Sequence, residues 1–217
     1  MQITLFGGHG KIALLLAPML VDAGHRVTSV IRNPDHVGDV EATGATAVVS
    51  SVEVADADTL VDLLAGQDAV VWSAGAGGGS PERTFAVDRD AAIRSMDAAS
   101  AAGAKRYVMV SFSGSDPDAL VPEDNPFRAY QDAKIAADEH LRSTDLDWTV
   151  LAPGSLTLEP GTGSVNPDAG FGDGDETSRE LVAQVVLAVL QDPRASRQTL
   201  VFGDGDVAID DWLGRLG

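Results

Sequence analysis

The chain has 217 residues, 44% of them hydrophobic, which fits one soluble globular domain with a sizeable core. Its 33 acidic and 15 basic residues give a net charge of −18, which argues against nucleic acid or an anionic membrane as a partner, because phosphate binding needs clustered cations. The absence of cysteine excludes disulfides, thiolate metal sites and cysteine catalysis. With no long apolar run and no leader pattern, we expect a cytoplasmic protein without membrane spans.

A glycine-rich turn near the N-terminus is the feature around which the rest of the chain is organised. It lies between an expected strand at Gln2–Phe6 and an expected helix at Lys11–Ala23. Gly7 allows the tight turn, Gly10 lets the backbone approach a pyrophosphate at the helix N-terminus, and Ala13 lets helix and strand pack closely. The alternative is a turn that serves only the fold. The motif predicts a dinucleotide site that includes Gly7, His9, Gly10, Lys11 and Ile12.

The residue that follows the second strand indicates which dinucleotide binds. The strand is expected at Arg26–Ile31, so Arg32 lies at its carboxyl end, where a doubly wound sheet faces the adenosine ribose. An acidic residue there binds the 2′-hydroxyl of NAD, whereas an arginine accommodates the 2′-phosphate of NADP. Arg32 therefore predicts NADP, the alternative being a solvated arginine in a turn.

Two further strands carry loops that should reach the cofactor. After a short helical segment at 34–43, the strand Ala45–Val49 leads into a loop that should pass near the adenine, with Val52 and Glu53 as competing contacts. The strand Asp68–Trp72 ends in the glycine-rich stretch 73–81, which should lie over the cofactor. The alternative for this stretch is a flexible linker.

The second half of the chain continues the alternation of helices and strands. The segment 155–175, rich in Gly, Pro, Thr and Asp, predicts a substrate-covering excursion containing a short hairpin. The other expected elements are helices at Asp56–Leu64, Glu82–Ala102, Phe127–Ser143 and Ser178–Leu190, and strands at Arg106–Ser111, Trp148–Leu151 and Gln198–Phe202. This pattern predicts an α/β Rossmann fold, a doubly wound parallel sheet with helices on both faces, forming a single domain over 1–217.

Tyr130 and Lys134 are the residues best suited to catalysis. They are four residues apart, so both project from one face of the expected helix. An ammonium one turn away favours the phenolate, so we expect a lowered pKa for Tyr130 and proton exchange with a carbonyl or alcohol oxygen. A hydroxyl at the end of the preceding strand, Ser111 or else Ser113, could bind the same oxygen, and Lys134 could hold the nicotinamide ribose. The alternative is a surface aromatic beside a solvated lysine.

These features together resemble the short-chain dehydrogenase/reductase superfamily, and within it the atypical NAD(P)H-binding branch called sugar-epimerase-like or NmrA-like. The resemblance rests on Gly7–Ala13, Arg32, Ser73-Ala74-Gly75, Ala102–Ser111, Tyr130 with Lys134, and Trp148–Gly154. It implies that Ser111, Tyr130 and Lys134 are catalytic, that Ser73, Ala74 and Gly75 bind cofactor, and that Pro153 and Gly154 lie against the nicotinamide. One departure is Ala152, where many relatives carry arginine.

The sequence therefore predicts an NADP-dependent oxidoreductase that acts on a small carbonyl, quinone or alcohol substrate. Segment 155–175 contains no lysine or arginine, which disfavours a nucleotide-sugar diphosphate as substrate. The alternatives are an NAD(P)-dependent sugar epimerase and a non-catalytic NADP-sensing regulator that binds a partner protein. The histidines show no metal spacing, so we expect no metal site, and the sequence does not indicate an oligomeric state.

Overall fold

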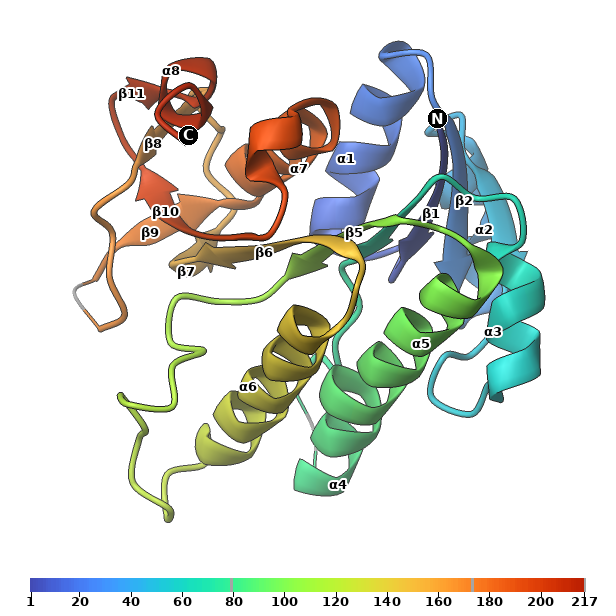
Figure 1. Ribbon diagram of the computed structural model, residues 1–217, viewed down its shortest axis with the longest axis horizontal. Coiled ribbons are helices and arrows are strands. Elements are labelled where there is room, and N and C mark those ends of the chain that lie inside the picture. The colour runs from blue at the N-terminus through green and yellow to red at the C-terminus, as the bar shows by residue number, and fades with distance from the viewer. Residues whose placement is uncertain (79, 173, 217) are drawn as a thin grey trace.

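A nine-stranded sheet runs through the middle of the molecule in the computed structural model drawn in Figure 1. The structure describes residues 1–78, 80–172 and 174–216. The sheet has the strand order β11-β8-β10-β6-β5-β4-β1-β2-β3. Its strands are β1 Gln2–Phe6, β2 Arg26–Ile31, β3 Thr46–Val49, β4 Ala69–Trp72, β5 Arg106–Val110, β6 Asp147–Pro153, β8 Ser164–Asn166, β10 Gln198–Asp204 and β11 Val207–Ala208.

The strands from β3 to β10 along the sheet pair in parallel. From β1 the chain builds outward through β2 and β3, and then returns to place β4 on the other side of β1. This reversal creates a crevice at the carboxyl ends of β1 and β4, where open α/β sheets bind ligands. The predicted doubly wound fold is thereby confirmed, with β8 and β11 adding a short antiparallel edge that was not predicted.

Helices cover both faces of the sheet (Figure 1). Helices α1 and α7 pack on one face, in a core that includes Leu16, Leu20 and Val186, whereas α3, α5 and α6 cover the other. The helices are α1 Lys11–Asp22, α2 Val37–Glu41, α3 Ala57–Leu64, α4 Pro81–Thr84, α5 Ala92–Ala102, α6 Arg128–Ser143, α7 Arg179–Gln191 and α8 Ile209–Leu213. None of these helices is long and apolar enough to cross a membrane.

The expected long helix Glu82–Ala102 is confirmed, since helical structure runs without a break from Pro81 to Ala102. Its middle part, the π-helical turn Phe85–Ala91, connects α4 to α5. Asp88 lies in this turn, and its carboxylate accepts a hydrogen bond from the backbone N–H of Ala76 over 3.0 Å. Such turns occur often at functional sites. This contact joins residues 12 apart in sequence, so the helical pattern could not reveal it.

Segment 155–175 does not form the expected hairpin. Its first strand, β7 Ser155–Thr157, pairs in parallel with β9 Glu176–Ser178, while β8 joins the main sheet. The segment therefore spans two sheets, and its role as a substrate cover stays a prediction. Asp173 in this segment and Gly79 in the glycine-rich stretch lie outside the described residues.

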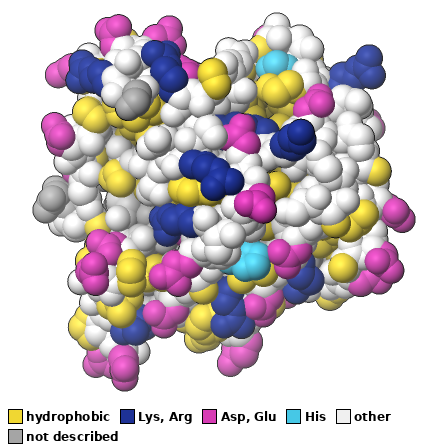
Figure 2. Space-filling view, in the orientation of Figure 1, with side chains coloured by type: hydrophobic (Ala, Val, Ile, Leu, Met, Phe, Trp, Pro, Cys, Tyr) yellow, Lys and Arg dark blue, Asp and Glu magenta, His cyan; other side chains and the backbone are white. Residues whose placement is uncertain are grey.

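Charged side chains are spread over the face seen in Figure 2. Asp and Glu side chains lie along much of its outline, and several Lys and Arg side chains lie near its middle with Asp and Glu side chains among them.

Candidate active site

The glycine turn is pressed against the end of β4. Gly7 has a φ of +79°, and a Cβ added to it would lie 2.7 Å from the Cα of Ala74. The backbone N–H of Gly10 donates to the carbonyl of Gly7 over 2.7 Å, which closes the turn directly before α1. No side chain among the described residues caps this helix, so its first N–H groups remain available for an anion.

A cavity of about 400 Å³ adjoins this turn at the carboxyl ends of β1, β2, β3 and β4. Its walls come from five separate segments, within 7–10, 30–36, 50–53, 73–77 and 83–87. The predicted cofactor residues that line it are Gly7, His9, Gly10, Arg32, Val52, Ser73, Ala74 and Gly75. The structure thus brings most of the predicted cofactor site together in one cavity.

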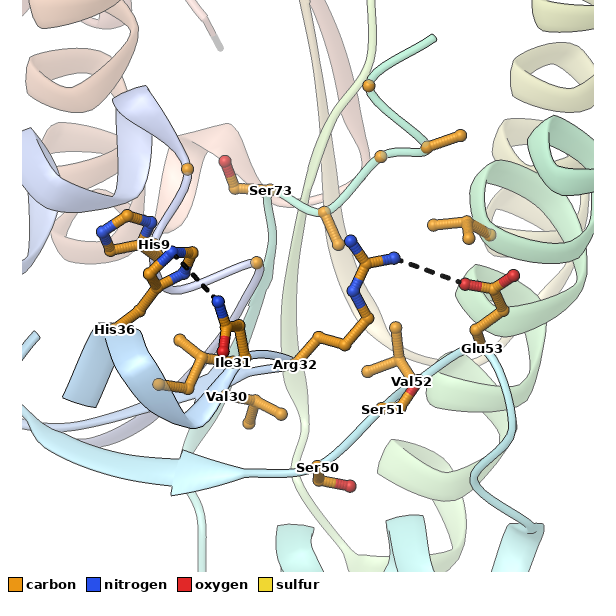
Figure 3. Close-up of a pocket in the computed structure, with 18 of the residues that line it drawn as sticks. His9, Val30, Ile31, Arg32, His36, Ser50, Ser51, Val52, Glu53 and Ser73 are labelled. Atoms are coloured by element: carbon orange, nitrogen blue, oxygen red, sulfur yellow. Dashed lines mark hydrogen bonds and ion pairs between the residues drawn. The ribbon is translucent and has the colours of Figure 1, made fainter. Parts of the chain in front are cut away.

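Arg32 lies in this cavity with an exposed side chain, and Figure 3 shows that it reaches toward Glu53. Its Nη1 is 3.8 Å from Glu53 Oε2, and Nε of Arg83 is 3.5 Å from the same carboxylate oxygen. Arg94 donates to the carbonyls of Val52 and Glu53 and so fixes the loop that carries them. Both residues proposed for the adenine line the cavity, so the choice between them stays open.

His9 and Lys11 differ in their positions. His9 stacks on His36 with ring centroids 3.6 Å apart, and its Nε2 is 2.9 Å from Asp39 Oδ2. His36 also lines the cavity, and no motif in the sequence predicted this position. Lys11 begins α1 with an exposed side chain and lines neither this cavity nor the next, so its predicted role depends on its backbone N–H.

A second cavity, of about 460 Å³, continues from the first across the glycine-rich loop. Residues 73–77 line both cavities, and Ile12 lies at the start of the second. The predicted catalytic residues Ser111, Tyr130 and Lys134 all line this second cavity. The two cavities thus lie next to each other along the carboxyl edge of the sheet, where a dinucleotide would place its two halves.

Lys134 is buried on α6, with 1% of its surface exposed. Its Nζ donates to the carbonyl of Val110 over 3.0 Å and to the sulfur of Met109 over 3.3 Å. An ammonium has three donors, so one is left for a ligand.

The pKa of Tyr130 is raised above its ordinary value, chiefly because burial disfavours the phenolate and further because Asp88 and Asp138 are negatively charged. The expectation that Lys134 lowers this pKa is therefore wrong for the protein without a bound cofactor. The Tyr130 hydroxyl stays protonated at neutral pH, and it makes no hydrogen bond within the described residues.

Asp138 is a fully buried carboxylate one turn beyond Lys134 that the sequence did not single out. Its Oδ2 accepts hydrogen bonds from the hydroxyls of Ser111, over 2.5 Å, and Ser115, over 2.6 Å. The Ser111 hydrogen is therefore directed away from the cavity, and its lone pairs are left to accept. Ser113, the alternative serine, lines a different cavity and does not adjoin Lys134.

Asp88 is the second buried carboxylate beside this cavity, with 3% of its surface exposed. Its pKa is raised because burial disfavours the charged form; the Ala76 N–H and the charges of Lys134 and Arg83 oppose this shift. Asp88 thus holds the glycine-rich loop through the Ala76 N–H, near enough to Lys134 for the lysine charge to act on its carboxyl. Only the folded chain brings these groups together, so the sequence pattern gave no sign of them.

A third cavity, of about 590 Å³, opens beyond Tyr130. It shares four lining residues with the second cavity, Ser111, Phe127, Tyr130 and Leu156. Pro153 and Gly154 line this third cavity, and their predicted contact with the nicotinamide stays a prediction. Among the residues that the structure describes, no group of three or more His, Asp or Glu side chains could hold a metal ion.

Comparison with known proteins is consistent with this geometry. Residues 7–193 match the model of a family described as NAD(P)H-binding. The chain is 35% identical, over 95% of its length and 91% of the relative, to a UPF0659 protein of Schizosaccharomyces pombe. It is similar to a solved structure from Bacillus halodurans, named as a candidate NAD-dependent epimerase/dehydratase, with 30% identity, 99% of both chains covered and a TM-score of 0.89. A Lactococcus lactis protein named the oxidoreductase ylbE is 25% identical, with 99% of this chain and 95% of that chain covered and a TM-score of 0.85.

Proposed function

Because the chain belongs to the NAD(P)H-binding family, we propose that it is an NADP-dependent oxidoreductase of the atypical short-chain dehydrogenase/reductase type that reduces a small carbonyl or quinone. The observation that carries this proposal is the position of Tyr130, with Ser111 and Lys134, in the cavity that lies next to the one lined by the glycine turn. The match to the NAD(P)H-binding family supports binding of a nicotinamide cofactor. The Tyr130 hydroxyl, as the proposed proton donor, supports catalytic turnover. A single domain over residues 1–217 and a cytoplasmic location belong to the same proposal.

The residues present fit a dinucleotide. The uncapped N-terminus of α1 offers N–H groups to a pyrophosphate, and Gly10 leaves space beside them. Arg32 supports NADP over NAD, because its exposed guanidinium can pair with a 2′-phosphate in place of its long 3.8 Å contact with Glu53. The second cavity would then hold the nicotinamide ring.

Tyr130 is proposed as the proton donor. When bound, the nicotinamide of NADPH supplies a hydride to the substrate carbon. The Tyr130 phenol carries its proton at neutral pH, so Tyr130 can give that proton to the substrate oxygen.

Ser111 and Lys134 are proposed as binding groups. The lone pairs of Ser111 can accept the O–H of the product alcohol, because its own hydrogen is held by Asp138. The remaining donor of Lys134 can bind a ribose hydroxyl, while Val110 and Met109 hold the ammonium in place. In these roles Lys134 would hold the cofactor ribose and Ser111 would hold the alcohol O–H that forms beside Tyr130.

Assays of NADPH oxidation with Tyr130→Phe test this proposal. Quinones, flavins, aldehydes and ketones are supplied to the wild-type protein, to Tyr130→Phe and to Tyr107→Phe, which alters the chain's other tyrosine. We expect Tyr130→Phe to lower kcat by about 10²–10⁴-fold, the usual contribution of a general acid. The Tyr107 hydroxyl hydrogen-bonds to the Ser95 hydroxyl inside the core. Because Tyr107 lies away from the cavities, folded Tyr107→Phe should keep its activity.

Other outcomes separate the alternatives. Turnover that survives in Tyr130→Phe would mean hydride transfer without this acid. NADPH binding without oxidation on any substrate would contradict the reductase and favour an epimerase, the activity in the name of the Bacillus halodurans relative. A protein whose NADPH affinity is unchanged in Tyr130→Phe and which has no activity at all would fit a sensor that binds a partner protein.

A further inference from the structure

Aromatic side chains gather beside Tyr130. The chain has six phenylalanines and two tyrosines, and three of those phenylalanines form a cluster with Tyr130. Phe112 lies edge-on to Phe127, at 5.4 Å between centroids, and edge-on to Phe171, at 5.7 Å. Phe127 and Phe171 are nearly parallel to each other, with an interplanar angle of 15° and centroids 6.4 Å apart.

This cluster comes from three separate segments and is left open to solvent. Phe112 follows β5, Phe127 immediately precedes α6, and Phe171 belongs to the excursion between β8 and β9. Phe127 is 38% exposed and Phe171 is 41% exposed, whereas Phe6 and Phe202 are fully buried. Exposed aromatic rings that gather at a cavity mark a binding surface rather than a core.

The aromatic cluster is next to the reacting group of the proposed function. Phe127 and Tyr130 line both the second and the third cavity, and their ring centroids are 5.1 Å apart. A ring that packs on Phe127 and Phe171 would thus occupy the third cavity. A carbonyl attached to that ring could then point toward the Tyr130 hydroxyl.

Two charged groups of the third cavity make hydrogen bonds to the backbone. Nη1 of Arg179 donates to the carbonyls of Leu156 and Thr157, over 3.0 and 2.7 Å. Asp175 accepts from the backbone N–H of Gly170 over 2.9 Å. These contacts hold the strand and loop that carry Leu156 and Phe171. Leu156 and the aromatic rings in the described lining therefore provide an apolar surface on which a ring can pack.

From these observations we infer that the substrate is a planar aromatic carbonyl compound whose ring packs against Phe127 and Phe171. This inference rests on the proposed function and names the substrate class for the same site. In the reaction the carbonyl carbon gains a hydride, and NADPH is oxidised to NADP⁺. The C=O π bond breaks, the oxygen takes the proton of Tyr130, and Tyr130 recovers a proton from solvent.

A matched pair of substrates tests the inference kinetically. Benzaldehyde and cyclohexanecarbaldehyde differ in the planarity and π system of the ring, and each is assayed with wild type, Phe127→Leu and Phe171→Leu. We expect either variant to raise KM for benzaldehyde about 2- to 10-fold, the usual worth of an aromatic pair, with kcat largely kept. KM for the saturated aldehyde should stay within about twofold. Leu158→Ala is the control, because Leu158, directly after β7, is 73% exposed and lines none of the three cavities.

Direct binding separates failure of this inference from failure of the proposed function. Titration calorimetry of 2-naphthamide and its saturated-ring analogue, with NADP⁺ present, measures ring recognition without turnover. Tighter binding of 2-naphthamide that is lost in Phe171→Leu supports the aromatic site, even if no carbonyl is reduced and the reductase proposal fails. Equal binding of both amides, unchanged in both folded variants, overturns the inference even if some carbonyl is turned over.

Discussion

The hydroxyl of Ser111 lies 2.5 Å from Oδ2 of the buried carboxylate of Asp138 and donates its hydrogen to it. Ser115 donates to the same oxygen over 2.6 Å. A buried carboxylate that accepts two hydroxyl hydrogens fixes the rotamer of Ser111. It also determines which partner Ser111 can serve, because only the lone pairs of that hydroxyl remain for a ligand.

Ser111→Ala should lower kcat/KM for carbonyl reduction by about 2- to 10-fold, the usual worth of one neutral hydrogen bond. Ser113→Ala is the matched control, since Ser113 lines only the third cavity, and it should stay within about twofold of wild type. Steady-state kinetics with NADPH checks both. A larger loss in Ser113→Ala than in Ser111→Ala would reverse the assignment of the two serines.

The tyrosine hydroxyls of the folded protein should ionise only at unusually high pH. The chain has two, Tyr107 and Tyr130, and burial raises the pKa of each. In absorbance titrations of the folded protein, tyrosinate should appear only well above pH 10, whereas urea-unfolded chains should titrate near about 10. Tyr107→Phe leaves Tyr130 as the sole signal.

The raised pKa values also predict how stability depends on alkaline pH. Above pH 10 the folded state binds more protons than the unfolded state, so the stabilisation present below about 10 is lost as pH rises. Urea midpoints measured from pH 8 upward should fall from about pH 10. If the folded Tyr107→Phe protein showed tyrosinate at neutral pH, it would mean that Tyr130 is activated by Lys134 after all.

Arg32→Ala should weaken the binding of NADPH by roughly 10- to 100-fold, which is the contribution expected of a charge-assisted hydrogen bond. The affinity for NADH should change much less. Arg26→Ala is the control, since Arg26 is an exposed arginine at the opposite end of the same strand. Fluorescence titration with both nucleotides gives the comparison. Equal weakening of NADPH and NADH would remove the argument for a 2′-phosphate contact.

Local sequence signals predicted the elements that depend on local physics. The run of β-branched residues after Gly24 gave β2 its bounds, and Asp56 caps α3 as expected by accepting from the Thr59 N–H. The glycine turn and Arg32 were predicted to face one site, and both line the first cavity. Periodicity and turn chemistry are readable because they involve neighbours in the chain.

The pKa of Tyr130 and the hydrogen bonds of Lys134 could not be predicted from local sequence patterns. Burial of Tyr130, and to a smaller extent the buried carboxylates Asp88 and Asp138, reverses the predicted pKa shift of this tyrosine, and each of these effects depends on tertiary packing. Lys134 follows the expected helical spacing, yet its ammonium is directed to the Val110 carbonyl on β5. The i, i+4 spacing placed these side chains on one helix face, but it could not show which groups would surround them.

Gly7→Ala should destabilise the fold more than Gly24→Ala, although both glycines have a positive φ, +79° and +83°. The left-handed conformation costs an L-residue about 1–2 kcal/mol at either position. At Gly24 an added Cβ meets nothing within 4 Å, whereas at Gly7 it would lie 2.7 Å from backbone atoms of Ala74. Overpacking of this kind adds about 1–3 kcal/mol. Urea unfolding of the two variants measures the difference in their free energies of unfolding. Equal decreases would show that the backbone after β4 shifts to accept the added Cβ without loss of stability. A folded Gly7→Ala protein should also bind NADPH more weakly, because the turn and the cofactor loop would have to part.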